Sequence, residues 1–267
     1  MVLSGLISQE TYGSKPLIHM RDLQLSYGSG VKQRIILEGL DLDVQAGEFV
    51  CVLGPSGCGK SSLLKLIAGY ETATAGDARV NGEELRGPST EIGVVFQQAT
   101  LFPWLTVEKN VSFSLKMKGV PRTLRKQIAR ERLAQVGLIE VAGLLPHQLS
   151  GGMKQRAAIA RTLAAEPKLM LMDEPFGALD SITRQSLQEQ LSHLWRQTNK
   201  TIFFITHDVD EALYLGSRII VMNGKPGRIM LDVNNPLNGK SSNAENHREL
   251  RGYNELRHRL LQSLKIS

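Results

Sequence analysis

The chain has 267 residues, of which 42% are hydrophobic and 22% charged, a balance that is ordinary for a globular protein and leaves room for one large domain or a core with a subdomain. No apolar run approaches the roughly 18 residues of a membrane-spanning helix, which excludes an integral membrane protein. The formal net charge of +6 would suit nucleic acid or an anionic membrane surface, but no basic run with interleaved aromatic residues is present, so nucleic acid is the weaker interpretation.

Three β-rich segments precede the first motif that carries chemistry. Leu17–Tyr27 and Ile35–Val44 are predicted strands around a glycine-bearing turn, and Phe49–Leu53 is a short, continuously apolar strand. The stretch Ser61–Ile67, on the far side of the motif, has the pattern of a helix. The motif therefore lies between a strand and a helix.

A phosphate-binding loop fills that position, because the segment fits the pattern G-x-x-x-x-G-K-[ST] at every fixed position. We expect its residues and the next serine to contact a nucleotide: Gly54, Pro55, Ser56, Gly57, Cys58, Gly59, Lys60, Ser61 and Ser62. Backbone N–H groups of such a turn converge on phosphate oxygens, and the helix dipole favours the same charge. Lys60 supplies a point charge for the β- and γ-phosphates, and the Ser61 hydroxyl can bind Mg²⁺. An incidental lysine in a glycine turn is the weaker alternative, so we expect the chain to bind a nucleoside triphosphate.

A second candidate anion site lies far from the first in sequence. Ser150, Gly151 and Gly152 precede a stretch of good helix formers, and such a helix start offers backbone N–H groups to an anion. They lie within Val107–Ala165, which is predicted to be mostly helical with breaks at its two prolines. Because this helix start is distant from the phosphate loop, we expect it to contact a different nucleotide from the one that the phosphate loop binds.

Two more apolar strands end in residues capable of chemistry. Leu169–Met172 leads into Asp173 and Glu174, and Thr201–Ile205 leads to His207. Continuous apolar runs suit central strands that are buried on both faces, and α/β sheets bind ligands at the carboxyl ends of such strands. Adjacent carboxylates repel unless a cation or a proton separates them, so one can hold Mg²⁺ while the other polarises water. The alternatives are a solvated acidic turn and a structural histidine.

The pattern weakens toward the C-terminus. Ile219–Met222 is predicted to be the last strand of the core. The stretch Asn234–Asn246 is rich in Asn, Ser and Gly and is predicted to be a loop, and a charged helix is expected around Arg248–Leu264.

Two observations predict the compartment. Met1–Lys15 lacks the basic start, apolar centre and cleavage site of a secretory signal. Cys51 and Cys58 lie too close to the phosphate loop to be read as a structural disulfide. We therefore expect a reducing cytoplasm.

Together these motifs resemble ATP-binding cassette (ABC) proteins over nearly the whole chain. The residues that carry the resemblance occur in the family's order and at similar spacings: Tyr27, the phosphate loop, Gln97, Leu149–Gly152, Leu169–Glu174, Ala178–Asp180 and His207. The resemblance implies an α/β fold, namely a P-loop NTPase (RecA-like) core with an antiparallel β part and an α-helical subdomain inserted over roughly 99–165. It assigns 1–225 to the ABC ATPase domain and 226–267 to a C-terminal loop and helix extension.

The resemblance also implies roles for single residues. It assigns Asp173 to Mg²⁺, Glu174 to general-base catalysis on the attacking water, and His207 to the γ-phosphate and that water. Gln97 would reach Mg²⁺ or the water rather than serve as a polar strand end. Tyr27 would stack on adenine rather than be an ordinary strand aromatic. ATP and Mg²⁺ are the expected cofactors, and the other histidines are expected on the surface or in packing roles: His19, His147, His193, His247 and His258.

A complete site of this kind needs two chains. In the family, the residues that match Ser150 and Gly152 contact the γ-phosphate held by the opposite protomer. The resemblance also places Asp180 among the nucleotide-binding residues. The chain carries one copy of each motif, so we expect it to pair with a second copy of itself or with a related cassette. ATP binding would close the dimer and hydrolysis would favour its opening.

The segment after Gln97 suggests what this cycle drives. Phe102 and Trp104 are either core residues at a subdomain joint or anchors of a groove that docks a membrane permease. The form Pro-Trp-Leu-Thr-Val, with Glu174–Asp180 and Pro226–Ile229, resembles bacterial importers of the nitrate/sulfonate/taurine/bicarbonate group. That resemblance implies a peripheral subunit on the cytoplasmic face of the inner membrane, integral membrane permease subunits, a periplasmic or lipid-anchored solute-binding protein and a small anionic solute.

Two other classes of protein share part of this pattern. A soluble ABC ATPase that acts on ribosomes or DNA usually carries long coiled-coil insertions or two cassettes, and this sequence shows neither. A P-loop kinase or switch protein would not need the Leu149–Gly152 loop or His207. No nucleic-acid partner is expected.

Overall fold

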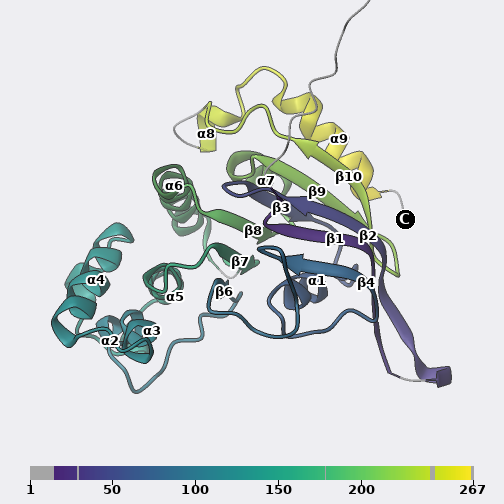
Figure 1. Ribbon diagram of the computed structural model, residues 1–267. Helices are drawn as coiled ribbons and strands as arrows, with labels where there is room; N and C mark the ends of the chain where they lie inside the picture. The colour runs from purple at the N-terminus through teal and green to yellow at the C-terminus, as the bar shows by residue number, and fades with distance from the viewer. Residues whose placement is uncertain (1–14, 29, 178, 241–243, 266–267) are drawn as a thin grey trace, which may run out of the picture.

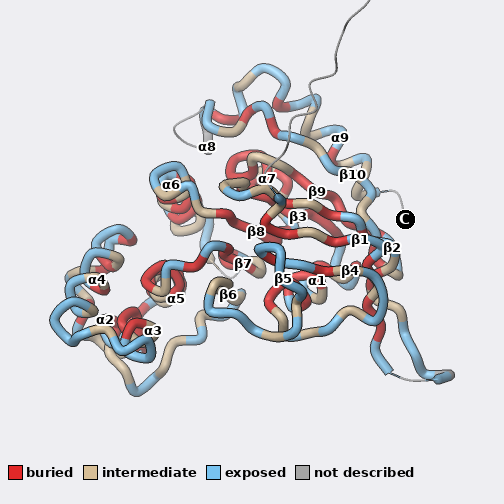
Figure 2. Tube along the Cα trace, viewed as in Figure 1, coloured by how far each residue is buried: buried red, intermediate tan, exposed pale blue. Residues whose placement is uncertain are grey.

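The computed structural model describes residues 15–28, 30–177, 179–240 and 244–265 (Figure 1). Two β-sheets lie at its centre, and a group of helices, α2 to α5, extends away from them on one side (Figure 1). The central strands are buried along nearly their whole length, whereas the outer faces of the helices are exposed (Figure 2). This arrangement agrees with the predicted α/β core with an antiparallel part and an inserted helical subdomain.

The smaller sheet is antiparallel and has the strand order β2-β1-β4-β5. In its central pairings, Ile18 lies opposite Val44 of one neighbour and Val80 of the other. The buried residues of β1 and β2 belong to a hydrophobic core cluster that also contains residues of the larger sheet. The strands are β1 (Ile18–Tyr27), β2 (Arg34–Val44), β4 (Ala75–Val80) and β5 (Glu83–Glu84), and a single 3-10 turn, Gly30–Lys32, lies between β1 and β2.

The larger sheet has the order β10-β9-β3-β8-β7-β6, and all its pairings are parallel except β10 with β9. Its strands are β3 (Phe49–Leu53), β6 (Ile92–Val95), β7 (Leu169–Asp173), β8 (Thr201–Ile205), β9 (Arg218–Asn223) and β10 (Arg228–Asn234). Along β3, Val50 and Val52 face one core cluster, and Phe49, Cys51 and Leu53 face the other. Alternation of side chains along a strand explains why a continuously apolar run belongs at the centre of this sheet.

Helices cover both faces of the larger sheet. Helix α1 shares a core with the smaller sheet, whereas α6, α7 and α9 pack on the opposite face. Their bounds are α1 (Lys60–Ile67), α6 (Ser181–Thr198), α7 (Val209–Leu215) and α9 (Tyr253–Lys265), with a short α8 (Ala244–His247) before α9.

The inserted helices have a hydrophobic core of their own, built around Val107, Leu133 and Ala157. They connect to the sheet through α5, where the Gln155 side chain donates to the Phe96 carbonyl at 3.1 Å. Their bounds are α2 (Val107–Val111), α3 (Phe113–Met117), α4 (Arg122–Gln135) and α5 (Gly151–Ala164), with 3-10 turns at Ile139–Val141 and Pro146–Gln148.

The predicted strands agree with the structure to within one residue at each end, but one prediction about them is wrong. Ile219–Met222 is not the last strand of the core, because β10 follows it and pairs with β9 at the sheet edge. Along β10, exposed and half-buried residues alternate, which is why it lacks the apolar run of a central strand. Strands β4 and β5 and helices α6 and α7 were also not predicted. The charged C-terminal helix starts at Tyr253 rather than near Arg248, and α8 begins within the predicted loop and ends just past it.

Both cysteines are free and buried. Across the described residues, no helix is both long and apolar enough to cross a bilayer.

Candidate functional site

The phosphate loop connects β3 to the N-terminus of α1, as predicted. Gly59 adopts φ 94° at the N-cap of α1, a left-handed conformation that favours glycine. A Cβ atom on Gly54 would lie 2.5 Å from the Met222 carbonyl oxygen, so the loop can run against β9 only without a side chain there. Lys60 is 6% exposed, and its ammonium donates to the carbonyls of Gly54 and Pro55 at 2.7 and 3.0 Å. The loop thus holds a positive charge beside a helix N-terminus, which is the chemistry that binds phosphate.

The end of β7 brings a carboxylate to this loop. The Ser61 hydroxyl donates to Oδ1 of Asp173 at 3.1 Å. Burial raises the pKa of Asp173, the hydrogen bond from Ser61 opposes this, and the neighbouring charge of Glu174 adds to it. A buried carboxylate that is costly to ionise gains from a bound cation. A hydroxyl and a carboxylate oxygen are ligands that Mg²⁺ accepts, with water and phosphate completing its octahedron, so these two residues fit the expected metal.

Glu174 and His207 meet at the ends of two neighbouring strands. His207 Nδ1 lies 3.1 Å from Oε2 of Glu174, and the His207 side chain is 66% exposed. Glu174 has φ 42°, which is uncommon for a residue with a side chain. Backbone conformations of this kind cluster at active sites, although Asp22, Asn81, Glu166 and Asn199 of this chain also adopt a positive φ. The predicted pair therefore forms one unit, open to an incoming substrate.

Gln97 reaches the same place from the end of β6. A Cβ atom on Gly177 would lie 3.3 Å from Nε2 of Gln97 and 3.7 Å from Oε2 of Glu174. The amide of Gln97 and the carboxylate of Glu174 therefore both lie close to Gly177. The sequence separates these residues widely, and the parallel order β8-β7-β6 brings them together.

Tyr27 lies at the edge of the phosphate-loop helix. Its side chain is 39% exposed, and its hydroxyl interacts with Ser62 and Glu71. Burial raises the pKa of Tyr27. The ring is exposed beside the first turn of α1, and its contact with adenine stays a prediction.

The second loop begins a helix as predicted. The Ser150 hydroxyl accepts a hydrogen bond from Met153 N at 3.3 Å and so caps α5. A Cβ atom on Gly152 would lie 2.5 Å from the Thr183 methyl, in the first turn of α6. That turn is capped by Asp180, which accepts from Thr183 N at 2.9 Å.

These residues form a surface of their own. Ser150, Gly151 and Asp180 are exposed. Within the described part of the chain, no hydrogen bond or ion pair joins Ser150, Gly151 or Gly152 to the phosphate loop. The predicted nucleotide contacts therefore fall into two groups, one around Lys60 and one around Ser150.

Three further residues around Glu174 and His207 were not predicted. Arg184, Asp208 and Glu211 line the small cavity that contains the predicted pair. Asp208 caps α7 by accepting from the backbone N–H groups of Asp210 and Glu211 at 2.9 and 3.2 Å. The Thr-His-Asp run contains this cap signal, since Asp is a preferred N-cap residue. The place of Arg184 depends on how α6 packs, for which the sequence has no local signal.

The loop after Gln97 exposes one of its aromatic rings. Trp104 is 73% exposed, so the core alternative is wrong for this residue. Its ring lies 5.7 Å from that of Phe102, which packs 4.5 Å from Phe113 and so supports it. Beside Trp104 lies a groove of about 490 Å³. Five basic side chains line this groove, and among the described residues none of them forms an ion pair: Lys109, Lys116, Arg122, Arg125 and Lys126.

Comparison with known proteins points to one family. Residues 37–177 match the family model for ABC transporters. The chain is 48% identical to a taurine import ATP-binding protein of Chromobacterium violaceum, over 75% of this chain and 77% of that protein. It is 45% identical to a nitrate import ATP-binding protein of Synechocystis, over 79% of this chain and 80% of that protein. A solved dimeric ATP-binding cassette in a post-hydrolysis state, bound to ADP and Pi, superposes with a TM-score of 0.70 at 33% identity, over 81% of this chain and 98% of that one.

Proposed function

Because this chain belongs to the ABC transporter family and is an ATPase, we propose that it hydrolyses Mg²⁺-bound ATP to energise uptake of a small anionic solute through a separate permease. The observation that carries the proposal is the meeting of Glu174 and His207 at 3.1 Å beside the Ser61–Asp173 pair. The anionic class of solute is supported by the import proteins to which the chain is similar, since taurine carries a sulfonate and nitrate is an anion.

The mechanism follows from the positions of these side chains. Lys60 and the loop N–H groups would hold the β- and γ-phosphates. Ser61 and Asp173 would hold Mg²⁺, with Gln97 as the further ligand, and the ion would neutralise charge on the transferred phosphoryl group. Glu174 would accept the proton of the attacking water, and His207 would orient that water and contact the γ-phosphate.

We infer that a complete site forms between two copies of the chain or between this chain and a related cassette. Ser150 and Gly151 lie at an exposed helix N-terminus, and among the described residues no bond joins them to the phosphate loop of their own chain. In a head-to-tail dimer these backbone N–H groups would face the γ-phosphate bound by the partner, with Asp180 beside them. ATP would then bridge the two protomers.

The groove beside Trp104 would dock a cytoplasmic segment of the permease. An exposed aromatic ring is a frequent anchor at protein interfaces. The basic side chains around it favour a partner that supplies acidic residues. The chain would then lie peripherally on the cytoplasmic face of the inner membrane, while a periplasmic or lipid-anchored protein delivers the solute.

The alternative of an ABC ATPase that acts on ribosomes or DNA is less favoured. The full-length chain, affinity-tagged and purified from gently solubilised cells with ATP, tests the choice. Recovery of integral membrane subunits in stoichiometric amount supports the importer. Recovery of ribosomes or DNA in their place would refute it.

A further inference from the structure

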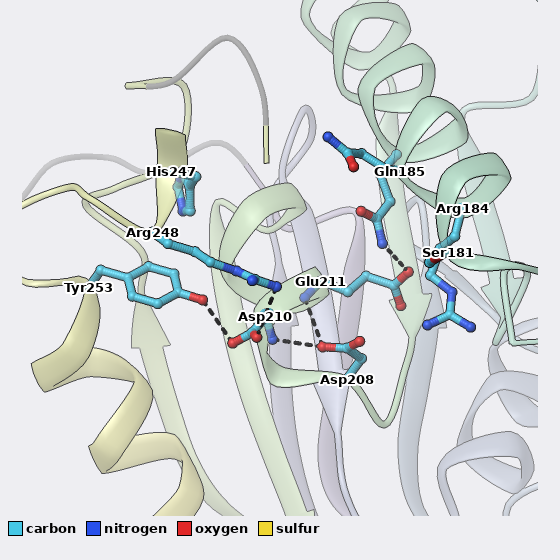
Figure 3. Close-up of a pocket in the computed structure, with 10 residues that line it drawn as sticks. Ser181, Arg184, Gln185, Asp208, Asp210, Glu211, His247, Arg248 and Tyr253 are labelled. Atoms are coloured by element: carbon cyan, nitrogen blue, oxygen red, sulfur yellow. Dashed lines mark hydrogen bonds and ion pairs between the residues drawn. The ribbon is translucent and has the colours of Figure 1, made fainter. Parts of the chain in front are cut away.

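The C-terminal segment contacts the helix that follows His207. Three of its side chains converge on the carboxylate of Asp210, in the first turn of α7. Two of them, Arg248 and Tyr253, are drawn in Figure 3. The Tyr253 hydroxyl and Arg257 Nε each donate to Oδ1 at 2.7 Å, and Arg248 lies 3.4 Å from Oδ2. We call Arg248, Tyr253 and Arg257 the C-terminal clamp.

The clamp is built on a firmly packed base. The apolar face of α9 joins the core of the larger sheet through Leu256 and Leu260. The His247 ring lies edge-on between the rings of Tyr214 and Tyr253, at 5.6 and 5.8 Å. Burial disfavours the charge of Asp210, but the bonds from Arg257 and Tyr253 outweigh it and lower the pKa of this carboxyl. Asp210 is therefore held as an anion by charge-assisted hydrogen bonds.

The clamped turn begins directly after His207. Asp208 accepts from the backbone N–H of Asp210, and its own N–H donates to the Thr206 hydroxyl at 3.0 Å. These bonds connect the turn to the residues on either side of His207. They therefore link Asp210 to the loop that carries the imidazole.

The same turn separates two cavities. One, of about 220 Å³, lies between α6, α7 and the C-terminal segment (Figure 3). The other contains Glu174 and His207. Arg184, Asp208 and Glu211 line both cavities, so the turn is a shared wall. Glu211 crosses toward α6, where Gln188 Nε2 donates to its Oε1 at 2.9 Å.

We propose that Tyr253 and Arg257 are positioning residues for ATP hydrolysis, which act through Asp210 to hold His207 in reach of Glu174 and the γ-phosphate. The leucines of α9 supply the stability of the C-terminal segment, and the clamp supplies orientation. This inference rests on the proposed roles of Glu174 and His207. It gives the extension after residue 225 a part in catalysis.

The test removes the two short bonds of the clamp and keeps Arg248 and the packing of α9. In the full-length chain, Tyr253→Phe with Arg257→Gln deletes both short bonds to Asp210. Arg259→Gln is the matched control, because Arg259 is exposed on the same helix and makes no bond to Asp210. We expect kcat of the double variant to fall about tenfold, since small misplacements of a catalytic group are costly, while its KM for ATP stays within about twofold of that of the unmodified chain. Both kcat and KM of Arg259→Gln should stay within about twofold of the unmodified chain.

A second readout reports on His207 itself. Histidine-labelled protein gives NMR signals for the imidazole rings, and loss of one signal in His207→Ala identifies that of His207. We expect this signal to shift in the clamp variant and to stay in place in Arg259→Gln. Tyr253→Phe alone, which keeps the ring against His247, provides the same comparison if the double variant does not fold.

The outcomes separate this inference from the proposed function. An unchanged kcat and an unmoved His207 signal in the clamp variant would overturn the clamp, even if Glu174→Gln abolished hydrolysis. A loss of melting temperature with neither change would also overturn it, because the residues would then serve stability alone. Normal turnover by Glu174→Gln would instead refute the proposed catalytic site.

Discussion

Truncation of Trp104 is expected to separate assembly from stability. Its side chain is 73% exposed, so about a quarter of the roughly 250 Å² of a tryptophan is buried in the isolated chain, or about 60 Å². At about 25 cal/mol per Å², Trp104→Ala should cost at most about 1.5 kcal/mol of unfolding free energy. For a chain of this size that lowers the melting temperature by no more than about 5 °C.

The cost for assembly should be larger. Buried aromatic anchors lose about 2 kcal/mol or more on truncation, which is roughly thirtyfold in affinity. We therefore expect Trp104→Ala to keep its fold and basal ATPase activity while its co-purification with permease subunits falls. The assay compares melting temperature, ATP turnover and permease recovery in one preparation.

The chain's other tryptophan provides the matched control. Trp195 packs edge-on against Phe49 at 5.6 Å, and its Nε1 donates to the Gly47 carbonyl at 3.1 Å. Trp195 is half-buried against this core, so Trp195→Ala should cost about 3 kcal/mol, the low end of the range for truncation of a core aromatic, and lower the melting temperature by about 10 °C. If Trp104→Ala melts like Trp195→Ala, or assembles as well as the unmodified chain, the reasoning about the groove is wrong.

Three further predictions concern the catalytic centre and its surroundings. Glu174→Gln should still bind ATP but lose about a hundredfold or more in turnover and accumulate as an ATP-bound dimer on size exclusion; near-normal turnover would rule out Glu174 as the base. Lys60→Ala and Ser150→Arg should each be inactive alone, while their mixture forms a heterodimer with one intact site; absence of any ATP-dependent dimer in the mixture would contradict a shared site. Burial raises the pKa of Glu211, so the folded state favours the neutral form of this carboxyl. The stability that the neutral form contributes is fully present below the ordinary glutamate pKa and is lost as the pH rises through the raised pKa. Glu211→Gln keeps the acceptor for Gln188, so its melting temperature relative to the unmodified chain should be higher at pH 8 than at pH 5, and the reverse order would refute this account.

Local patterns in the sequence were sufficient for the elements that carry chemistry. The apolar run of β3 followed by the glycine-rich loop predicted the phosphate site, because strand, turn and helix start are specified by neighbouring residues. The runs of β7 and β8 likewise predicted that Asp173, Glu174 and His207 lie at strand ends. These signals are short in range, and the structure agrees with them.

The tertiary structure alone decided what lies between those elements. Strand β10 escaped prediction because an edge strand needs only one buried face, and α6 because its buried residues are defined by the sheet against which it packs. The exposure of Trp104 depends on the packing around it. The bonds of Tyr253 and Arg257 to Asp210 join residues that are far apart in the chain. Contacts of this kind are set by how the elements pack. The local sequence therefore determines which chemical groups lie at the end of a strand, and the tertiary structure determines which residues of other elements lie beside them.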